Sequence, residues 1–207
     1  MLTRENAGEA AGWNTSDAIR RYVDDLTRLL AALDTEAIVK FADILFSAYQ
    51  EGRTVFFAGN GGSAATASHF ACDMAKTVTG YSKGKRLRAV SLADSVPLLT
   101  AWGNDSAYDD VFAEQLRNLA RPGDCLVAIS CSGKSKNVVR AVELARAMGL
   151  TTVGLLGFDG GTLKPMVDLP IVIESDNYQR VEDVHSIIMH IVTDRLIEAV
   201  NREGAAT

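Results

Sequence analysis

The sequence is short of cysteine and of basic residues and has no long apolar run, and each shortage excludes a class of protein. The formal net charge is −5, whereas a general nucleic-acid-binding surface needs a basic stripe. The three cysteines, Cys72, Cys125 and Cys131, lack C-x-x-C spacing, which disfavours a disulfide framework and a cysteine-based zinc cluster. No apolar run approaches the roughly 20 residues that span a bilayer, and residues 1–13 do not resemble a signal peptide. We therefore expect a cytoplasmic protein that binds neither nucleic acid nor membrane.

The composition is that of an ordinary folded domain. Of the 207 residues, 47% are hydrophobic and 23% charged, which suffices for one sheet covered by helices on both faces. We expect residues 1–15 to be a loose tail and residues 16–207 to form a single domain.

From residue 54 onward, short β-rich runs alternate with helical patterns. Strands separated by helices at this rhythm favour parallel pairing with right-handed crossovers. The expected strands are Thr54–Ala58, Arg88–Leu92, Cys125–Ile129, Thr152–Leu156 and Pro170–Ile173, and the expected helices are Ala64–Thr77, Val96–Trp102, Asp110–Leu119, Asn137–Met148 and Tyr178–Val200. The pattern predicts an α/β protein with a three-layer, doubly wound, five-stranded parallel sheet. Its ligand should lie off the carboxyl ends of the strands.

Two helices precede the first strand. The first begins near Ser16, and its apolar residues recur at steps of three and four, which places them on one side. The second runs from Asp34 to Glu51, and Gly52 ends it. Two helices offer more apolar surface than is needed to cover one face of the sheet. We therefore expect part of their apolar side to pack against another subunit.

Two strands are followed directly by a polar turn and a helix. The first turn, Gly59-Asn60-Gly61-Gly62-Ser63, is called the glycine turn below, and the second, Ser130-Cys131-Ser132-Gly133-Lys134-Ser135, the serine turn. Glycines let backbone N–H groups approach an anion, hydroxyls add donors, and a helix N-terminus adds partial positive charge. Two such turns in one domain favour anion binding over the alternative that both are merely capped strand-to-helix turns.

Two nucleotide motifs match these turns only loosely. Gly59, Gly61 and Ala64 satisfy the dinucleotide pattern G-x-G-x-x-[GA], but Asp94 lies some thirty residues on, where the pattern needs an acid about twenty residues away. The serine turn ends in Gly-Lys-Ser, yet Ala128 stands where the first glycine of a P-loop belongs. A nucleotide-dependent oxidoreductase stays a weaker hypothesis.

Four motifs resemble those of the SIS (sugar isomerase) domain family, most closely its phosphoheptose isomerase branch. In chain order they are the glycine turn, His69-Phe70-Ala71, Gly103-Asn104-Asp105 and the serine turn. The resemblance covers nearly the whole chain. It implies a flavodoxin-like sheet, a homotetramer with active sites at subunit interfaces, a phosphorylated sugar as substrate, and no nucleotide cofactor.

The resemblance also implies roles for individual residues. It places the sugar beside Asn60, Gly61, Gly62, Ser63, Asn104 and Asp105, and the phosphate on Ser130, Cys131, Ser132 and Ser135. It implies a divalent metal, often zinc, on His69, Asp73, Glu182 and His190, with Asp73 as base and His190 as acid in an aldose–ketose isomerisation, and Glu182 also against the substrate.

Two of the four implied metal ligands depart from the family pattern, and so does one further residue of the serine turn. Asp73 stands where the family has Glu, Glu182 where it has Gln, and Lys134 where it has Asn. Asp is one methylene shorter than Glu, and a misplacement of about 1 Å can cost a proton transfer about a hundredfold. The departures keep open a second hypothesis, a non-catalytic sugar-phosphate-binding protein with a regulatory role.

Spacing tests the proposed metal ligands. His69 and Asp73 are four residues apart and share one helix face, whereas Glu182 and His190 are eight apart, or about 12 Å of helix rise. One of the latter two is therefore expected to serve a neighbouring subunit. The alternative without a metal is that His69 and His190 are ordinary packing residues. We assign no functional role to His185.

Overall fold

The computed structural model describes residues 15–80 and 85–205, and the chain divides into two compact units, residues 1–33 and 34–207. The tail expected for residues 1–15 lies, except for Thr15, outside the described residues. The first unit contains helix α1 (Thr15–Ala31), in which Asp17 lies in the first turn and Arg28 in the last, the charge order that the helix dipole favours. Within the described ranges, no helix is long and apolar enough to cross a membrane.

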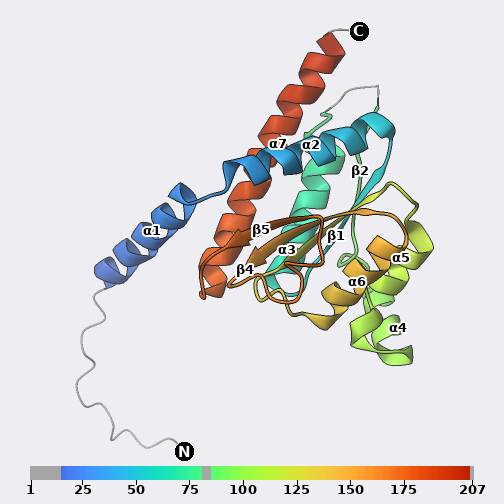
Figure 1. Cartoon of the computed structure of the whole chain (residues 1–207), viewed down its shortest axis with the longest axis horizontal. Helices are drawn as coiled ribbons and strands as arrows, with labels where there is room; N and C mark the ends of the chain where they lie inside the picture. The colour runs from blue at the N-terminus through green and yellow to red at the C-terminus, as the bar shows by residue number, and fades with distance from the viewer. Residues whose placement is uncertain (1–14, 81–84, 206–207) are drawn as a thin grey trace, which may run out of the picture. The chain divides into compact units, whose positions relative to one another are not determined.

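The second unit is built on a parallel sheet, as predicted (Figure 1). Its strands are β1 (Thr54–Ala58), β2 (Arg88–Ser91), β3 (Cys125–Ser130), β4 (Thr151–Gly157) and β5 (Leu169–Ile173), in the spatial order β2-β1-β3-β4-β5. Every strand pair is parallel, and Ala58 of β1 lies opposite Ala128 of β3. The two strands that precede the glycine and serine turns are therefore neighbours and end at the same edge.

Helices cover both faces of this sheet (Figure 1). Helices α2, α3 and α7 lie on one side, and α4, α5 and α6 on the other. Their bounds are α2 (Thr35–Glu51), α3 (Gly62–Cys72), α4 (Val96–Asp105), α5 (Ala113–Leu119), α6 (Lys136–Ala147) and α7 (Tyr178–Ala205), with a π-helical turn η1 (Asp73–Thr77) and a 3-10 turn η2 (Tyr108–Asp110).

The core explains why the central strands are apolar throughout. Every residue of β1 and β3 is buried, because helices pack on both faces of these strands. Phe56 and Leu126 lie in the cluster beneath α5 and α6, whereas Phe57 contacts Phe70 of α3 on the opposite face. Successive side chains of β1 thus point to opposite faces of the sheet and contribute to the core on both.

Helix α2 has the limits that its capping residues predict. The Asp34 side chain accepts a hydrogen bond from the Ala37 N–H at 3.0 Å, and Gly52 adopts the left-handed conformation with φ 69°. In contrast, the helix predicted for residues 64–77 is two elements. After Cys72 the helix widens, and the Asp73 carbonyl accepts from the Val78 N–H at 3.0 Å, an i to i+5 bond.

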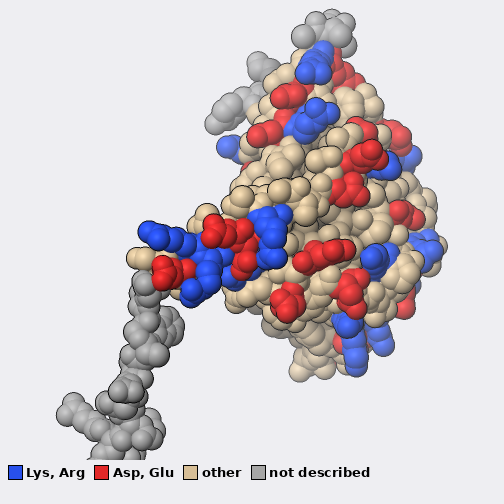
Figure 2. All heavy atoms as spheres, turned by 60° about the vertical axis from the view of Figure 1, so that its left-hand side comes forward, with Lys and Arg blue, Asp and Glu red and all other residues tan. Residues whose placement is uncertain are grey.

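Charged residues of both signs are interspersed on the face of the described residues that Figure 2 shows. Exposed ion pairs of this kind include Arg117 with Glu114, at 3.1 Å, on α5. Such pairs contribute little to stability, so the fold is held by its core.

Candidate functional site

The glycine and serine turns face one cavity of about 290 Å³ at the carboxyl ends of β1 and β3. Residues of both turns and of α7 line it: Asn60, Gly61, Gly62, Ser63, Ile129, Ser130, Cys131, Ser132, Ser135, Tyr178 and Glu182. Nine of these were predicted from the sequence to bind substrate. Helices α3 and α6 begin at this cavity, so their N-termini add donors and partial positive charge where an anion would lie.

The serine turn keeps its shape through a close backbone approach. Gly133 has φ 61°, and a Cβ added there would lie 2.0 Å from the Gly160 carbonyl oxygen. The Gly133 carbonyl in turn accepts a hydrogen bond from the Leu163 N–H at 3.0 Å. Only glycine fits this position, because any side chain would push the loop after β4 away.

Side-chain hydrogen bonds fasten the glycine turn to α6 and to the 3-10 turn η2. Asn60 and Asn137 exchange two amide hydrogen bonds, of 2.8 and 2.9 Å, and Asn137 is 3% exposed. The Tyr108 hydroxyl donates to the Asn60 Oδ1 at 3.1 Å. Because the amide oxygen of Asn60 accepts from both partners, the orientation of its amide is fixed. One N–H of Asn60 remains for a ligand.

The cavity also contains a carboxylate and a buried thiol. The Glu182 carboxylate lies against Gly62, where an added Cβ would be 2.3 Å from Oε1. Burial, and then the charge of Glu182, raises the pKa of Cys131 to about 11, so this thiol stays protonated at neutral pH. Cys131 therefore offers a weak donor to a ligand and is no nucleophile.

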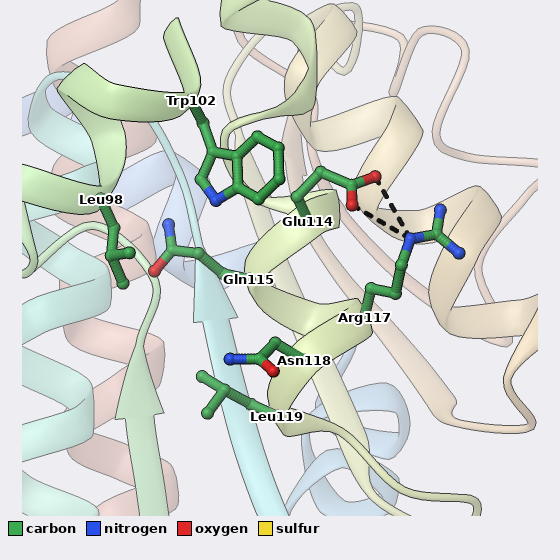
Figure 3. A pocket seen from close by; sticks show the side chains of 7 residues that line it. All are labelled: Leu98, Trp102, Glu114, Gln115, Arg117, Asn118 and Leu119. Atoms are coloured by element: carbon green, nitrogen blue, oxygen red, sulfur yellow. Dashed lines mark hydrogen bonds and ion pairs between the residues drawn. The ribbon is translucent and has the colours of Figure 1, made fainter. Parts of the chain in front are cut away.

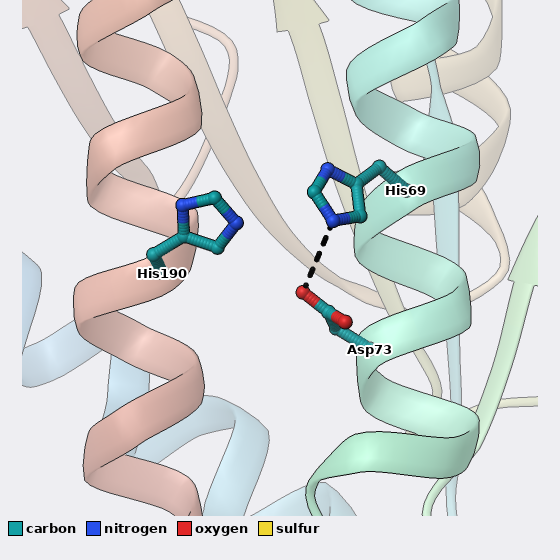
Figure 4. Close-up of side chains that lie close together, drawn as sticks. All are labelled: His69, Asp73 and His190. Carbon is teal, nitrogen blue, oxygen red and sulfur yellow. Dashed lines mark ion pairs between the residues drawn. The ribbon is translucent and has the colours of Figure 1, made fainter.

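Three of the four predicted metal ligands form a cluster, called the His–Asp–His cluster below (Figure 4). His69 of α3, Asp73 at the start of η1 and His190 of α7 each offer a ligand atom within 4.8 Å of the others. The His69 Nε2 lies 3.5 Å from an Asp73 oxygen, and the two imidazole centroids are 5.2 Å apart. The other Asp73 oxygen accepts a hydrogen bond from the Thr77 hydroxyl at 3.1 Å, which orients the carboxylate. Two imidazoles and a carboxylate suit a first-row divalent ion.

Other predicted residues lie elsewhere. Glu182 lines the cavity and is not a member of the His–Asp–His cluster. Asn104 and Asp105 end α4, where the Asn104 amide donates to the Asp105 carboxylate at 2.8 Å, and neither is among the residues that line the cavity. Within the described chain, the structure therefore brings the predicted phosphate ligands together, but not all four predicted metal ligands.

His185, which had no predicted role, is fully buried on α7. Its Nε2 lies 3.1 Å from the Leu156 carbonyl oxygen, so this nitrogen carries the proton and donates. Burial lowers the pKa of His185 to about 4. The residue is a neutral core histidine that fastens α7 to β4.

The nucleotide alternatives gain no support from the geometry. Asp94 accepts a hydrogen bond from the Ser68 hydroxyl and does not line the cavity. Strand β3 continues to Ser130, so Ala128 belongs to the strand and not to a phosphate loop.

A separate cavity lies between α4 and α5 (Figure 3). Leu98 and Trp102 of α4 face Gln115 and Leu119 of α5 across it. The buried amide of Gln115 donates to the carbonyls of Leu92 and Val111, at 2.9 and 2.7 Å. None of the predicted site residues lines this cavity; its Gln115 amide is bonded to the backbone, and its Glu114 and Arg117 pair with each other.

Sequence reasoning missed four residues of the main site, of which Ile129, near the end of β3, lines the cavity without a polar group. Tyr178 lines the cavity, and Asn137 and Tyr108 hold Asn60. The signal for Tyr178 was present, because it precedes Glu182 by four residues and so shares its helix face. The signal for Asn137 is only its place at a helix start two residues after the serine turn.

Comparison with known proteins gives consistent results. A model of the SIS domain matches residues 21–157. Two curated relatives named phosphoheptose isomerase, from Trichlorobacter lovleyi and Geobacter metallireducens, are 40% and 45% identical over 183 and 162 residues. These matches cover 87% and 77% of this chain and 92% and 84% of the relatives.

Solved structures agree with the sequence relatives. A phosphoheptose isomerase from Neisseria gonorrhoeae superposes with a TM-score of 0.80 at 31% identity, over 88% of this chain and 98% of that one. Another, from Francisella tularensis, gives 0.83 at 28% identity, over 89% of this chain and 99% of that one.

Proposed function

Because the chain belongs to the SIS domain family and to its phosphoheptose isomerase branch, it is a sugar-phosphate isomerase, and we propose that it converts sedoheptulose 7-phosphate to D-glycero-D-manno-heptose 7-phosphate. The observation that carries this proposal is the convergence of the glycine and serine turns on one cavity. The serine turn offers hydroxyls and helix-terminal N–H groups to the phosphate, and Asn60 and Glu182 offer hydrogen bonds to sugar hydroxyls.

The His–Asp–His cluster supports the chemistry of this reaction. Isomerisation moves a carbonyl between two adjacent carbons through an enediol, so it needs a base and an acid. In the proposed mechanism Asp73 takes a proton from the carbon beside the carbonyl, and His190 supplies a proton to the carbonyl oxygen. The hydrogen bond from Thr77 leaves the other Asp73 oxygen facing the two imidazoles.

The same residues fit a divalent metal ion. We propose zinc or a similar first-row ion on His69, Asp73 and His190, because their ligand atoms converge from two helices. A bound ion would polarise the oxygens of the substrate and favour the enediolate.

Oligomerisation would complete the site. On α7, Glu182 and His190 are about 12 Å apart along the helix, and on α3 the cluster begins seven residues after Gly62. One chain thus separates its proposed phosphate cavity from its cluster, which supports sites shared between subunits, and the assembly that we propose is a homotetramer. Light scattering should give the mass of four chains, and a monomer at assay concentration would contradict this.

A cytoplasmic location fits a sugar-phosphate substrate.

An assay with sedoheptulose 7-phosphate tests the activity. We expect aldose formation by the wild type in the presence of zinc, and a loss of about 10² to 10⁴ in kcat for Asp73→Asn, which removes the base but keeps the shape of the side chain. Glu143→Gln removes an exposed carboxylate on α6 and serves as the matched control. A metal-loaded wild type that converts neither sugar into the other would refute the isomerase.

The second candidate is a non-catalytic sugar-phosphate-binding protein, which the shorter side chain at Asp73 favours. It predicts tight binding of the sugar phosphate without turnover, and binding that is unchanged in Asp73→Asn. The same assay, run beside a binding measurement, separates the two candidates.

A further inference from the structure

Tyr178, the first residue of α7, presents an aromatic ring at the phosphate cavity. It is the only aromatic residue among the described residues that line this cavity, and it remains 53% exposed. The other lining groups are glycines, hydroxyls, an amide, a thiol, a carboxylate and Ile129. A tyrosine left half-exposed among polar groups is available to a ligand.

Phe158 holds this ring in place. The two rings meet edge to face, with centroids 4.9 Å apart and an interplanar angle of 80°. Phe158 has φ 54°, and it is the only non-glycine residue with a positive φ in residues 15–80 and 85–205. A phenylalanine in this conformation is strained, so other contacts must keep it there.

Those contacts fasten Phe158 to the serine turn. The Gly157 N–H, one residue before, donates to the Cys131 carbonyl at 3.0 Å, and the Phe158 N–H donates to the Ser175 carbonyl at 3.1 Å. The position of the aromatic pair is therefore set relative to the phosphate-binding groups.

We propose that Tyr178 contacts the sugar and determines which phosphorylated sugar is bound, and that Phe158 is its positioning residue. This inference rests on the proposed function. The serine turn would bind any phosphate monoester, and Asn60 and Glu182 would bind hydroxyls of the sugar. The carbon-bound hydrogens of the sugar form an apolar surface, which the ring of Tyr178 covers.

Calorimetry with two ligands tests the assignment. Tyr178→Ala should weaken the binding of sedoheptulose 7-phosphate about tenfold, because on the order of 50 Å² of apolar contact is lost. The affinity for inorganic phosphate should stay within about twofold, since the serine turn is untouched. Tyr178→Phe, which keeps the ring, should restore most of the sugar-phosphate affinity.

Phe158→Gly separates positioning from stability. Glycine adopts φ 54° without strain, so the melting temperature should not fall by more than the loss of one ring contact explains. The sugar-phosphate affinity should nevertheless fall about threefold or more, again with inorganic phosphate unaffected.

Two outcomes would overturn the inference alone. Equal sugar-phosphate affinity in the wild type and Tyr178→Ala would show that the ring makes no contact, and equal weakening of both ligands would show damage to the serine turn. Failure of the wild type itself to bind the sugar phosphate would instead overturn the proposed function and this inference with it.

Discussion

Asn137 is the residue through which the glycine turn and α6 are joined. Its amide pairs with Asn60 and also accepts from the Val138 N–H at 3.0 Å, so its hydrogen-bonding capacity is largely used inside the protein. Asn60 is thereby held with one N–H toward the cavity. The geometry of the proposed anion site therefore depends on Asn137, which is not among the residues that line the cavity.

Replacing Asn137 with leucine should affect both stability and binding. The change leaves a partly buried amide of Asn60 without its partner, which costs about 1 to 3 kcal/mol of unfolding free energy. We also expect weaker binding of inorganic phosphate, because the glycine turn is no longer fixed to α6. Urea unfolding and calorimetry measure the two effects.

Tyr108→Phe is the matched control for this prediction. It removes one exposed hydrogen bond to the same Asn60 oxygen and keeps the amide pair, so its cost should be well below that of Asn137→Leu. Equal effects of the two variants would show that the amide pair has no special role.

The site could be predicted as far as local sequence determines it. The two turns, His69 and Asp73 are recognisable because each set is contiguous or falls on one helix turn. Phe158 gave no signal, because the hydrogen bonds that hold it, from the Gly157 N–H to Cys131 and from its own N–H to Ser175, join residues far apart in the sequence. Glu182 lies outside the cluster because of how α7 packs against α3. The eight-residue spacing of Glu182 and His190 indicates that they lie apart, but it does not show which of them reaches His69 and Asp73.

At the scale of elements, the loop after β4 and the serine turn form one packed unit. Gly133 approaches Gly160, and Gly161 approaches the Ser132 carbonyl, where an added Cβ would lie 2.4 Å from the oxygen. Two glycine-containing segments from different crossovers therefore shape the side of the cavity where we propose that the phosphate binds.

Gly133→Ala tests this packing against Gly149→Ala. Both glycines have positive φ, so alanine costs about 1 to 2 kcal/mol at either position through backbone strain. Only at Gly133 does the new Cβ also meet backbone, which should add about 1 to 3 kcal/mol. Thermal unfolding compares the variants, and a Gly149→Ala protein at least as destabilised as Gly133→Ala would contradict the close approach.

The sequence predicted the elements well where a physical signal marks their ends. Asp34 and Gly52 bound α2, and the apolar runs of β1 and β3 identify buried strands. The π turn at Asp73 was not predicted, because the apolar spacing of residues 64–77 is compatible with an unbroken α-helix. The widening is visible only in the hydrogen bonds.

At the scale of the whole molecule, acid stability should depend on His185. The buried imidazole stays neutral down to about pH 4, whereas a histidine of the unfolded chain takes up its proton near pH 6.5. Between these values the unfolded state binds more protons, so the free energy of unfolding falls as the pH is lowered, by about 3 kcal/mol at pH 4. The contribution is complete above pH 6.5.

His185→Gln provides the comparison, because glutamine can still donate to the Leu156 carbonyl but does not titrate. Urea unfolding at pH 7 and pH 4.5 should show a steeper loss for the wild type than for the variant. Parallel pH profiles would mean that His185 is solvated or protonated in the folded protein.

The π turn has a consequence for how this helix tolerates changes of length. A π turn stores one residue more than the α turn that it replaces, and here the surplus is enclosed between Asp73 and Val78. A single-residue deletion in this stretch can be absorbed by conversion of the π turn to an α turn, while His69 and Asp73 before the surplus residue keep their positions. The separation between the Asp73 carboxylate and the His69 imidazole is thus insulated from a change of chain length in the segment that follows.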